Sequence, residues 1–134
     1  MYKLISINGS AVTRTVDLES INTGMVNTCF DDSALVSIDN NFEFMEVGEE
    51  YKCKVKLFGH IVERKSQPSV ECTVLEKNIK VGNTLLVEVS VDNDIYYINQ
   101  EKVASYLSEE KFTFEFTRKD LIQVDDIVHD DLLG

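Results

Sequence analysis

Residues Tyr51 to Val62 read YKCKVKLFGHIV, and this stretch decides the fold class. Apolar residues at odd positions alternate with lysines until Phe58 and Gly59 interrupt the pattern. A period of two indicates a β-strand with one buried face and one solvent-exposed face. The stretch therefore predicts a strand whose outer face is locally basic, in a chain of formal net charge -11.

The interruption at Phe58-Gly59 predicts a β-bulge. Glycine is common where strands bend, and an extra residue shifts the alternation by one position. With this shift, we expect His60 and Val62 to face the core. The strand should then bend at the glycine.

A second strand, Ser69 to Leu75, is expected to pair with the first after a turn over Arg64 to Pro68. This register makes His60 and Cys72 cross-strand neighbours, which is the first requirement of a thiolate-imidazole pair. No glycine-rich oxyanion loop or orienting carboxamide is evident nearby, so we interpret the two residues as a buried structural contact. We expect no enzyme, and an enzyme built on this pair is a third alternative.

Short apolar segments separated by turn residues continue along the chain. The expected turns are Asn8-Gly9, Asp39 to Asn41 between the segments 34–38 and 42–45, Val81 to Asn83, and Asp92 to Asp94. Asn99 is expected to cap a short helix over 100–107. A last strand follows, with Phe112, Phe114 and Phe116 on one face.

These elements predict an all-β or β-rich α+β fold, a small barrel or sandwich of about eight short antiparallel strands with one short helix before the last strand. The tight meander, the glycine interruption and the helix resemble an OB-type barrel. The resemblance covers mostly residues 47–116 and leaves the first 46 as extra strands. We expect one barrel-like domain over 1–119 and an acidic amphipathic segment over 120–134.

Composition limits the possible partners. Twenty-four acidic residues against thirteen basic ones give a pI near 4.5, and a surface of this sign repels nucleic acid and anionic membranes at long range. With no secretory signal and no membrane-spanning stretch, we expect a cytoplasmic protein. Three widely spaced cysteines are typical of reduced core residues, and they are Cys29, Cys53 and Cys72.

The C-terminal stretch DLIQVDDIVHDDLLG, residues 120–134, contains five acids and no base. Its apolar residues recur at spacings of three and four, which would place them on one face of a helix: Leu121, Val124, Val128 and Leu132. One hypothesis is that this face docks in a partner's groove. The other is that the segment packs, as a helix or a strand, on its own barrel.

The outer face of the opening strand carries Lys52, Lys54 and Lys56 about 6.7 Å apart. Together with Tyr96 as an exposed aromatic residue, these lysines could form a platform for single-stranded nucleic acid. We favour a solvated lysine face, because the net charge of the chain opposes nucleic acid.

No phosphate-binding, dinucleotide-binding or nucleophile-elbow motif is present, and we expect no cofactor. Asp125 and His129 are spaced as metal ligands on a helix would be, but a site needs a third ligand, and we expect no metal. The leading hypothesis is a non-enzymatic protein-interaction domain whose acidic surface and C-terminal segment bind a protein partner, for which a basic protein is a candidate. The alternative is an OB-like module that binds single-stranded nucleic acid through the lysine face.

Overall fold

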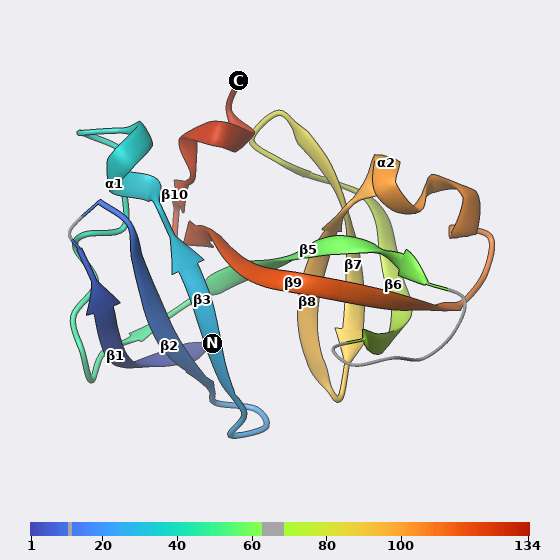
Figure 1. Ribbon diagram of the computed structural model, residues 1–134, viewed down its shortest axis with the longest axis horizontal. Coiled ribbons are helices and arrows are strands. Elements are labelled where there is room, and N and C mark those ends of the chain that lie inside the picture. The colour runs from blue at the N-terminus through green and yellow to red at the C-terminus, as the bar shows by residue number, and fades with distance from the viewer. Residues whose placement is uncertain (11, 63–68) are drawn as a thin grey trace.

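The computed structural model describes residues 1–10, 12–62 and 69–134, and within them a ten-stranded sheet closes on one side into a five-stranded barrel (Figure 1). The barrel contains β5 (Cys53–Val62), β6 (Ser69–Val81), β7 (Thr84–Val91), β8 (Asp94–Asn99) and β9 (Lys111–Val124). The sheet extends on the other side through β1 (Tyr2–Gly9), β2 (Arg14–Ser20), β3 (Val26–Asp31) and β4 (Glu50–Tyr51). The expected barrel-type, β-rich fold is confirmed.

Four short elements complete the described chain: α1 (Ser33–Val36), α2 (Gln100–Val103) followed by a 3₁₀ turn (Ala104–Tyr106), β10 (Ile127–Val128), and a last 3₁₀ turn (Asp130–Leu132). The helix expected before the last long strand is present at α2. The Asn99 side chain makes no capping hydrogen bond to it. None of the described helices is long and apolar enough to cross a membrane.

Strand β9 joins the two parts of the sheet. It pairs with β5 along one edge and with β6 along the other, which closes the barrel. Its last third reaches β3 through the pair Phe30 and Asp120, and then β10. Because β9 lies between β5 and β6, the expected pairing of those two strands is wrong. The turn expected at 64–68 lies outside the described residues.

The expected irregularity at Phe58-Gly59 is present as a register shift, but the extra residue lies on the opposite strand. Phe58 pairs with Arg118 and Gly59 with Phe116, so Thr117 of β9 is the additional residue. Strand β5 therefore keeps its alternation, and the expectation that His60 faces the core is wrong, since 66% of its side chain is exposed.

Two of the expected turns are confirmed. Strands β6 and β7 are joined after Val81, and β7 and β8 are joined by Asp92 and Asn93, both of which have positive φ. The first hairpin is also present, but its pairing continues to Gly9 and Arg14, so the reversal follows Asn8-Gly9. The hairpin expected over 34–45 is wrong, because that segment forms α1 and irregular turns.

Two clusters of buried apolar side chains stabilise the barrel and its extension. The larger fills the barrel and continues beneath the β1–β3 sheet. The smaller lies against the outside of the barrel and contains Val81, Leu86, Tyr97, Ile122 and Leu132. Leu132 comes from the last 3₁₀ turn, so the end of the chain is packed on the barrel.

We predict that Gly59→Ala destabilises the fold by about 2–4 kcal/mol, because a methyl group at this position would overlap the backbone of Glu115 on β9. Gly48→Ala is the matched control: its φ is positive, but no atom lies near the added methyl group, and its expected cost is about 1 kcal/mol. Urea denaturation followed by circular dichroism measures both. Equal losses would contradict the close crossing at Gly59.

Candidate interaction surface

The segment that follows β3, up to and including the first residue of β4, exposes almost only apolar and acidic side chains. Its exposed large apolar residues are Leu35, Val36, Ile38, Phe44 and Val47, and its exposed acids are Asp39, Glu43, Glu46, Glu49 and Glu50. Residues 31–51 contain seven acids and no Lys, Arg or His. We call the surface formed by these ten side chains the acidic-apolar face.

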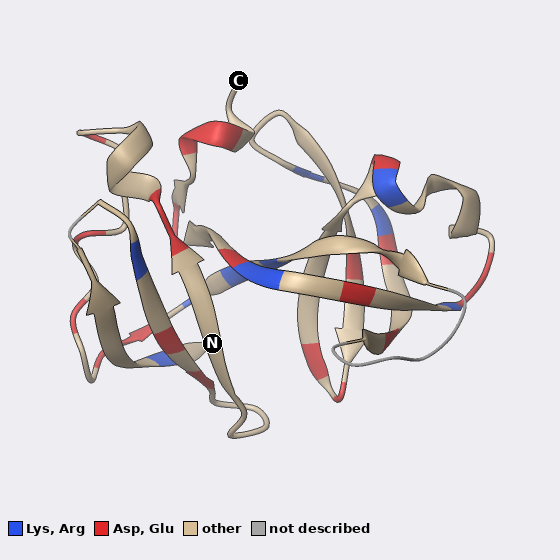
Figure 2. Cartoon of the chain, viewed as in Figure 1, with Lys and Arg blue, Asp and Glu red and all other residues tan. Residues whose placement is uncertain are grey.

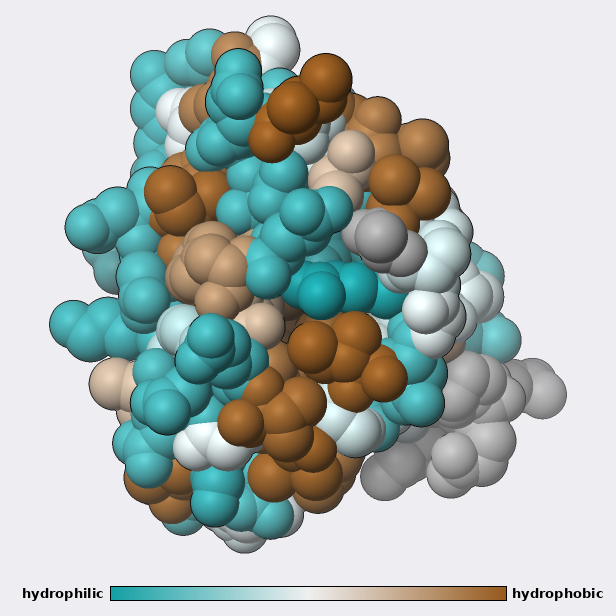
Figure 3. Space-filling model, turned by 90° about the vertical axis from the view of Figure 1, so that its left-hand side faces the viewer, coloured by the Kyte–Doolittle hydropathy of each residue, from teal (hydrophilic) through white to brown (hydrophobic). Residues whose placement is uncertain are grey.

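This face lies at the α1 end of the molecule, where acidic positions follow the loops (Figure 2). Seen from that end, apolar groups are separated by polar side chains over the surface (Figure 3). Ile38 is 93% exposed. Single exposed apolar residues are common on protein surfaces, but several together on one connecting segment are typical of an interaction site.

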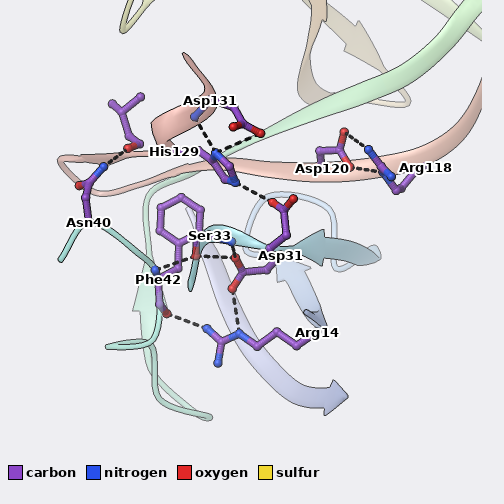
Figure 4. A network of polar contacts seen from close by, with 11 residues as sticks. Arg14, Asp31, Ser33, Asn40, Phe42, Arg118, Asp120, His129 and Asp131 are labelled. Atoms are coloured by element: carbon purple, nitrogen blue, oxygen red, sulfur yellow. Dashed lines mark hydrogen bonds and ion pairs between the residues drawn. The ribbon is translucent and has the colours of Figure 1, made fainter. Parts of the chain in front are cut away.

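A buried polar network holds this segment on the sheet (Figure 4). The Arg14 side chain donates from Nε to Asp31 Oδ2 at 2.8 Å and from a terminal nitrogen to the Phe42 carbonyl at 2.7 Å. Asp31 Oδ1 accepts from the backbone N–H and the hydroxyl of Ser33, and Ser33 Oγ accepts from the Phe42 N–H. The beginning and the middle of the segment are therefore fixed by the same buried network.

The end of the chain is bound to the same segment. His129 is buried, and its Nε2 lies 2.6 Å from Asp32 Oδ1, while its Nδ1 accepts the Asp131 backbone N–H at 3.1 Å. The Asn40 side chain donates to the Val128 carbonyl and to Asp130 Oδ1. Residues 128–131 thus hold the segment that carries the acidic-apolar face through hydrogen bonds to Asp32 and Asn40.

The residues that gather around His129 form a hydrogen-bonded cluster. Asp32 and Asp131 supply carboxylates near the imidazole, whereas Asp125 binds the backbone of Lys52. Because His129 Nδ1 accepts an N–H, a neutral imidazole carries its proton on Nε2 and donates it to Asp32. Both ring nitrogens of His129 are thus engaged in hydrogen bonds within the protein.

The expected docking residues of the C-terminal stretch face the protein's own interior. Leu121, Val124 and Leu132 are buried, and Val128 is half-buried. The helical interpretation is wrong, since residues 120–124 continue β9 and the following residues form β10 and a 3₁₀ turn. These four side chains belong to the packing of the barrel and its extension.

The expected lysine face is present, but the expected aromatic neighbour, Tyr96, is not exposed beside it. Lys52 is exposed, and Lys54 Nζ donates to Gln123 Oε1 at 3.0 Å. Lys56 lines a cavity of about 120 Å³ together with acidic and basic neighbours. Tyr96 is buried and donates its hydroxyl to Asn27 Oδ1, so the expectation of an exposed ring is wrong.

Phe58 is the exposed aromatic residue beside these lysines. It is 42% exposed, with the Arg118 guanidinium 5.0 Å and the Lys102 amino group 5.2 Å from its ring centroid. Its outward position follows from the alternation of β5, in which even-numbered residues face outward. The two cations come from β9 and α2, and no local pattern in the sequence places them there.

The structure separates the two residues of the third hypothesis. His60 lies opposite Glu115 and Cys72 opposite Phe112, on strands that do not pair with each other in the described chain. Burial raises the pKa of Cys72 to about 12. The thiol is therefore protonated at neutral pH and has no imidazole to activate it.

Comparisons with protein-family models, with curated proteins and with solved structures found no match to this chain. Its function must therefore be argued from its own surfaces. Among these surfaces, the acidic-apolar face is the strongest candidate for an interaction site, because a buried polar network holds its segment in place.

We predict that Arg14→Met destabilises the protein by about 3–5 kcal/mol, because it leaves the Asp31 carboxylate buried without its cation. Arg118→Met is the matched control: it removes the partly exposed pair with Asp120 and should cost about 1 kcal/mol or less. Thermal and urea unfolding give both values. A small loss for Arg14→Met would show that the segment does not depend on this ion pair.

Proposed function

We propose that this protein is a non-enzymatic interaction domain that binds a basic, amphipathic segment of a partner protein on the acidic-apolar face. The observation that carries the proposal is the composition of that face: exposed apolar side chains stand among exposed carboxylates with no base between them. A matching partner presents apolar side chains flanked by lysine or arginine. Burial of its apolar side chains would supply affinity, and its positive charges would supply orientation.

The charge and the rigidity of the face both favour such binding. A net charge of -11 attracts a basic segment at long range and accelerates its association. The buried contacts of Arg14 and His129 hold the connecting segment before a partner arrives. A surface ordered in advance loses less conformational entropy on binding.

The test uses a synthetic amphipathic peptide of leucine and lysine as the probe. Ile38→Asp should weaken its binding by about tenfold or more, since burial of one large aliphatic side chain contributes about 1.5–3 kcal/mol. Leu75→Asp, at an exposed apolar position on β6, is the matched control and should leave Kd unchanged within about twofold. Isothermal titration calorimetry at two salt concentrations measures Kd for each protein.

The proposal also requires that added salt weaken binding, because the carboxylates contribute to attraction. A peptide in which glutamate replaces lysine should not bind. Equal affinity of the Ile38→Asp and Leu75→Asp proteins would place the binding surface elsewhere.

A second candidate function is the binding of single-stranded nucleic acid through the surface around Phe58. It is favoured by one observation, an exposed aromatic ring with the cations of Arg118 and Lys102 over it and Lys56 nearby. The net negative charge and the buried Tyr96 weigh against it.

Filter binding with a thymidine oligonucleotide tests this second candidate. If it is correct, Lys102→Glu and Lys56→Glu should each weaken binding and flatten its dependence on salt, because each removes a phosphate contact. Lys3→Glu on β1 is the control with the same charge change. Retention that is absent at low salt, or equally reduced by all three variants, would exclude the Phe58 surface.

A further inference from the structure

Asp94, the first residue of β8, is a buried carboxylate that attracts Lys119 electrostatically but forms no close ion pair among the described residues. It is 4% exposed. Its Oδ1 accepts the Ser20 hydroxyl at 2.6 Å and its Oδ2 accepts the Thr23 hydroxyl at 2.5 Å. No described lysine, arginine or histidine forms an ion pair with it. Buried charges in proteins are normally paired or bound to an ion, because burial without compensation is costly.

This carboxylate lines a cavity of about 280 Å³. The cavity lies where the β2–β3 turn meets the β7–β8 turn, both at the lower end of the molecule in Figure 1. The contact between the turns is fixed by the Asn22 side chain, which donates to the Asn93 carbonyl at 2.8 Å. The cavity is lined by this carboxylate, by aromatic and aliphatic residues (Tyr2, Tyr97, Ile95 and Met1), and by Cys53 and the polar residues Ser20, Asn22 and Asn93.

Both tyrosines remain neutral, and Tyr2 lies close enough to sense the charge of Asp94. Burial raises the pKa of Tyr2, and the nearby Asp94 raises it further. Burial likewise raises the pKa of Tyr97. Neutral aromatic rings beside a carboxylate are the groups that proteins use to hold organic cations, through cation-π attraction and a direct ion pair.

We propose that this cavity binds a small organic ammonium ion. Asp94 would pair with the charged nitrogen, while Tyr2, Tyr97 and Ile95 would cover the alkyl part. Its volume is suited to a ligand smaller than the drug-sized molecules held in clefts of roughly 300–1,000 Å³. The overall negative charge raises the local concentration of cations.

This site shares no residue with the acidic-apolar face or with the surface around Phe58. It also does not depend on the proposed binding of a basic partner segment. The hydroxyls of Ser20 and Thr23 hold the carboxylate in one orientation before a ligand arrives. A carboxylate oxygen that accepts one such hydrogen bond still has capacity to accept a second from an ammonium group.

The experiment titrates the ¹⁵N-labelled protein with n-butylammonium chloride and, separately, with 1-butanol, which has the same chain without the charge. We expect saturable amide shifts for butylammonium at residues 20–22 and 93–95, and at least about tenfold weaker binding of butanol. Asp94→Asn should weaken butylammonium binding by a similar factor. Asp92→Asn, two residues away in the exposed turn, is the control with the same charge change and should bind within about twofold of the unaltered protein.

Equal binding of butylammonium and butanol would overturn the proposal, as would equal weakening by Asp92→Asn and Asp94→Asn. Shifts spread over the acidic surface without saturation would also overturn it, since they indicate general attraction of cations. The comparison of the two probes uses the unaltered protein, so the proposal can be rejected even if Asp94→Asn does not fold.

Discussion

The backbone hydrogen bonding of β9 is the constraint on which the rest of the structure depends. This strand closes the barrel by pairing with both β5 and β6, and it then leaves the barrel to meet β3 and β10. Two register shifts against β5 make this course possible, because each leaves one extra residue on β9, first Thr117 and then Ile122. Each shift exchanges the two faces of the strand. Phe114 can therefore face the barrel core, while Ile122 joins the second cluster.

The interaction surface is a product of the same arrangement. Asp31 at the end of β3 binds Arg14 on the neighbouring strand β2, and once β9 brings β3 beside the barrel, Asp32 can bind His129. Buried pairs of this kind add little net stability, since desolvation offsets much of the attraction, but they fix geometry. The exposed segment between β3 and β4 can be rich in apolar and acidic residues because its own buried contacts, through Ser33 and Phe42, maintain its course.

The sequence predicts those parts of the fold that have one buried face and one solvent-exposed face. The alternation in β5, the phenylalanines of β9 and the turn at Asp92-Asn93 all depend on local patterns, and all three are present. The sequence does not predict strand pairing that depends on residues far apart in the chain. Nothing in the local sequence indicates that β9 lies between β5 and β6, and the sequence therefore predicts, wrongly, that His60 lies beside Cys72.

The helical spacing of four apolar residues also misleads, because it arises from a bulged strand, β10 and a 3₁₀ turn: Leu121, Val124, Val128 and Leu132. The acidic-apolar face did have a signal, the absence of bases over 31–51, but burial was needed to show which apolar residues are exposed.

The contact between Asp32 and His129 joins residues 97 positions apart in the chain. During synthesis, which proceeds from the N-terminus at about 5–20 residues per second, β1 to β3 emerge well before β9 and the histidine that holds their edge. The β1–β3 hairpins can form locally, but their docking must wait until nearly the whole described chain has left the ribosome. In that interval their unpaired apolar face is exposed to other proteins. The order of the strands along the chain thus leaves the N-terminal sheet without its docking partner until β9 and His129 have been synthesised.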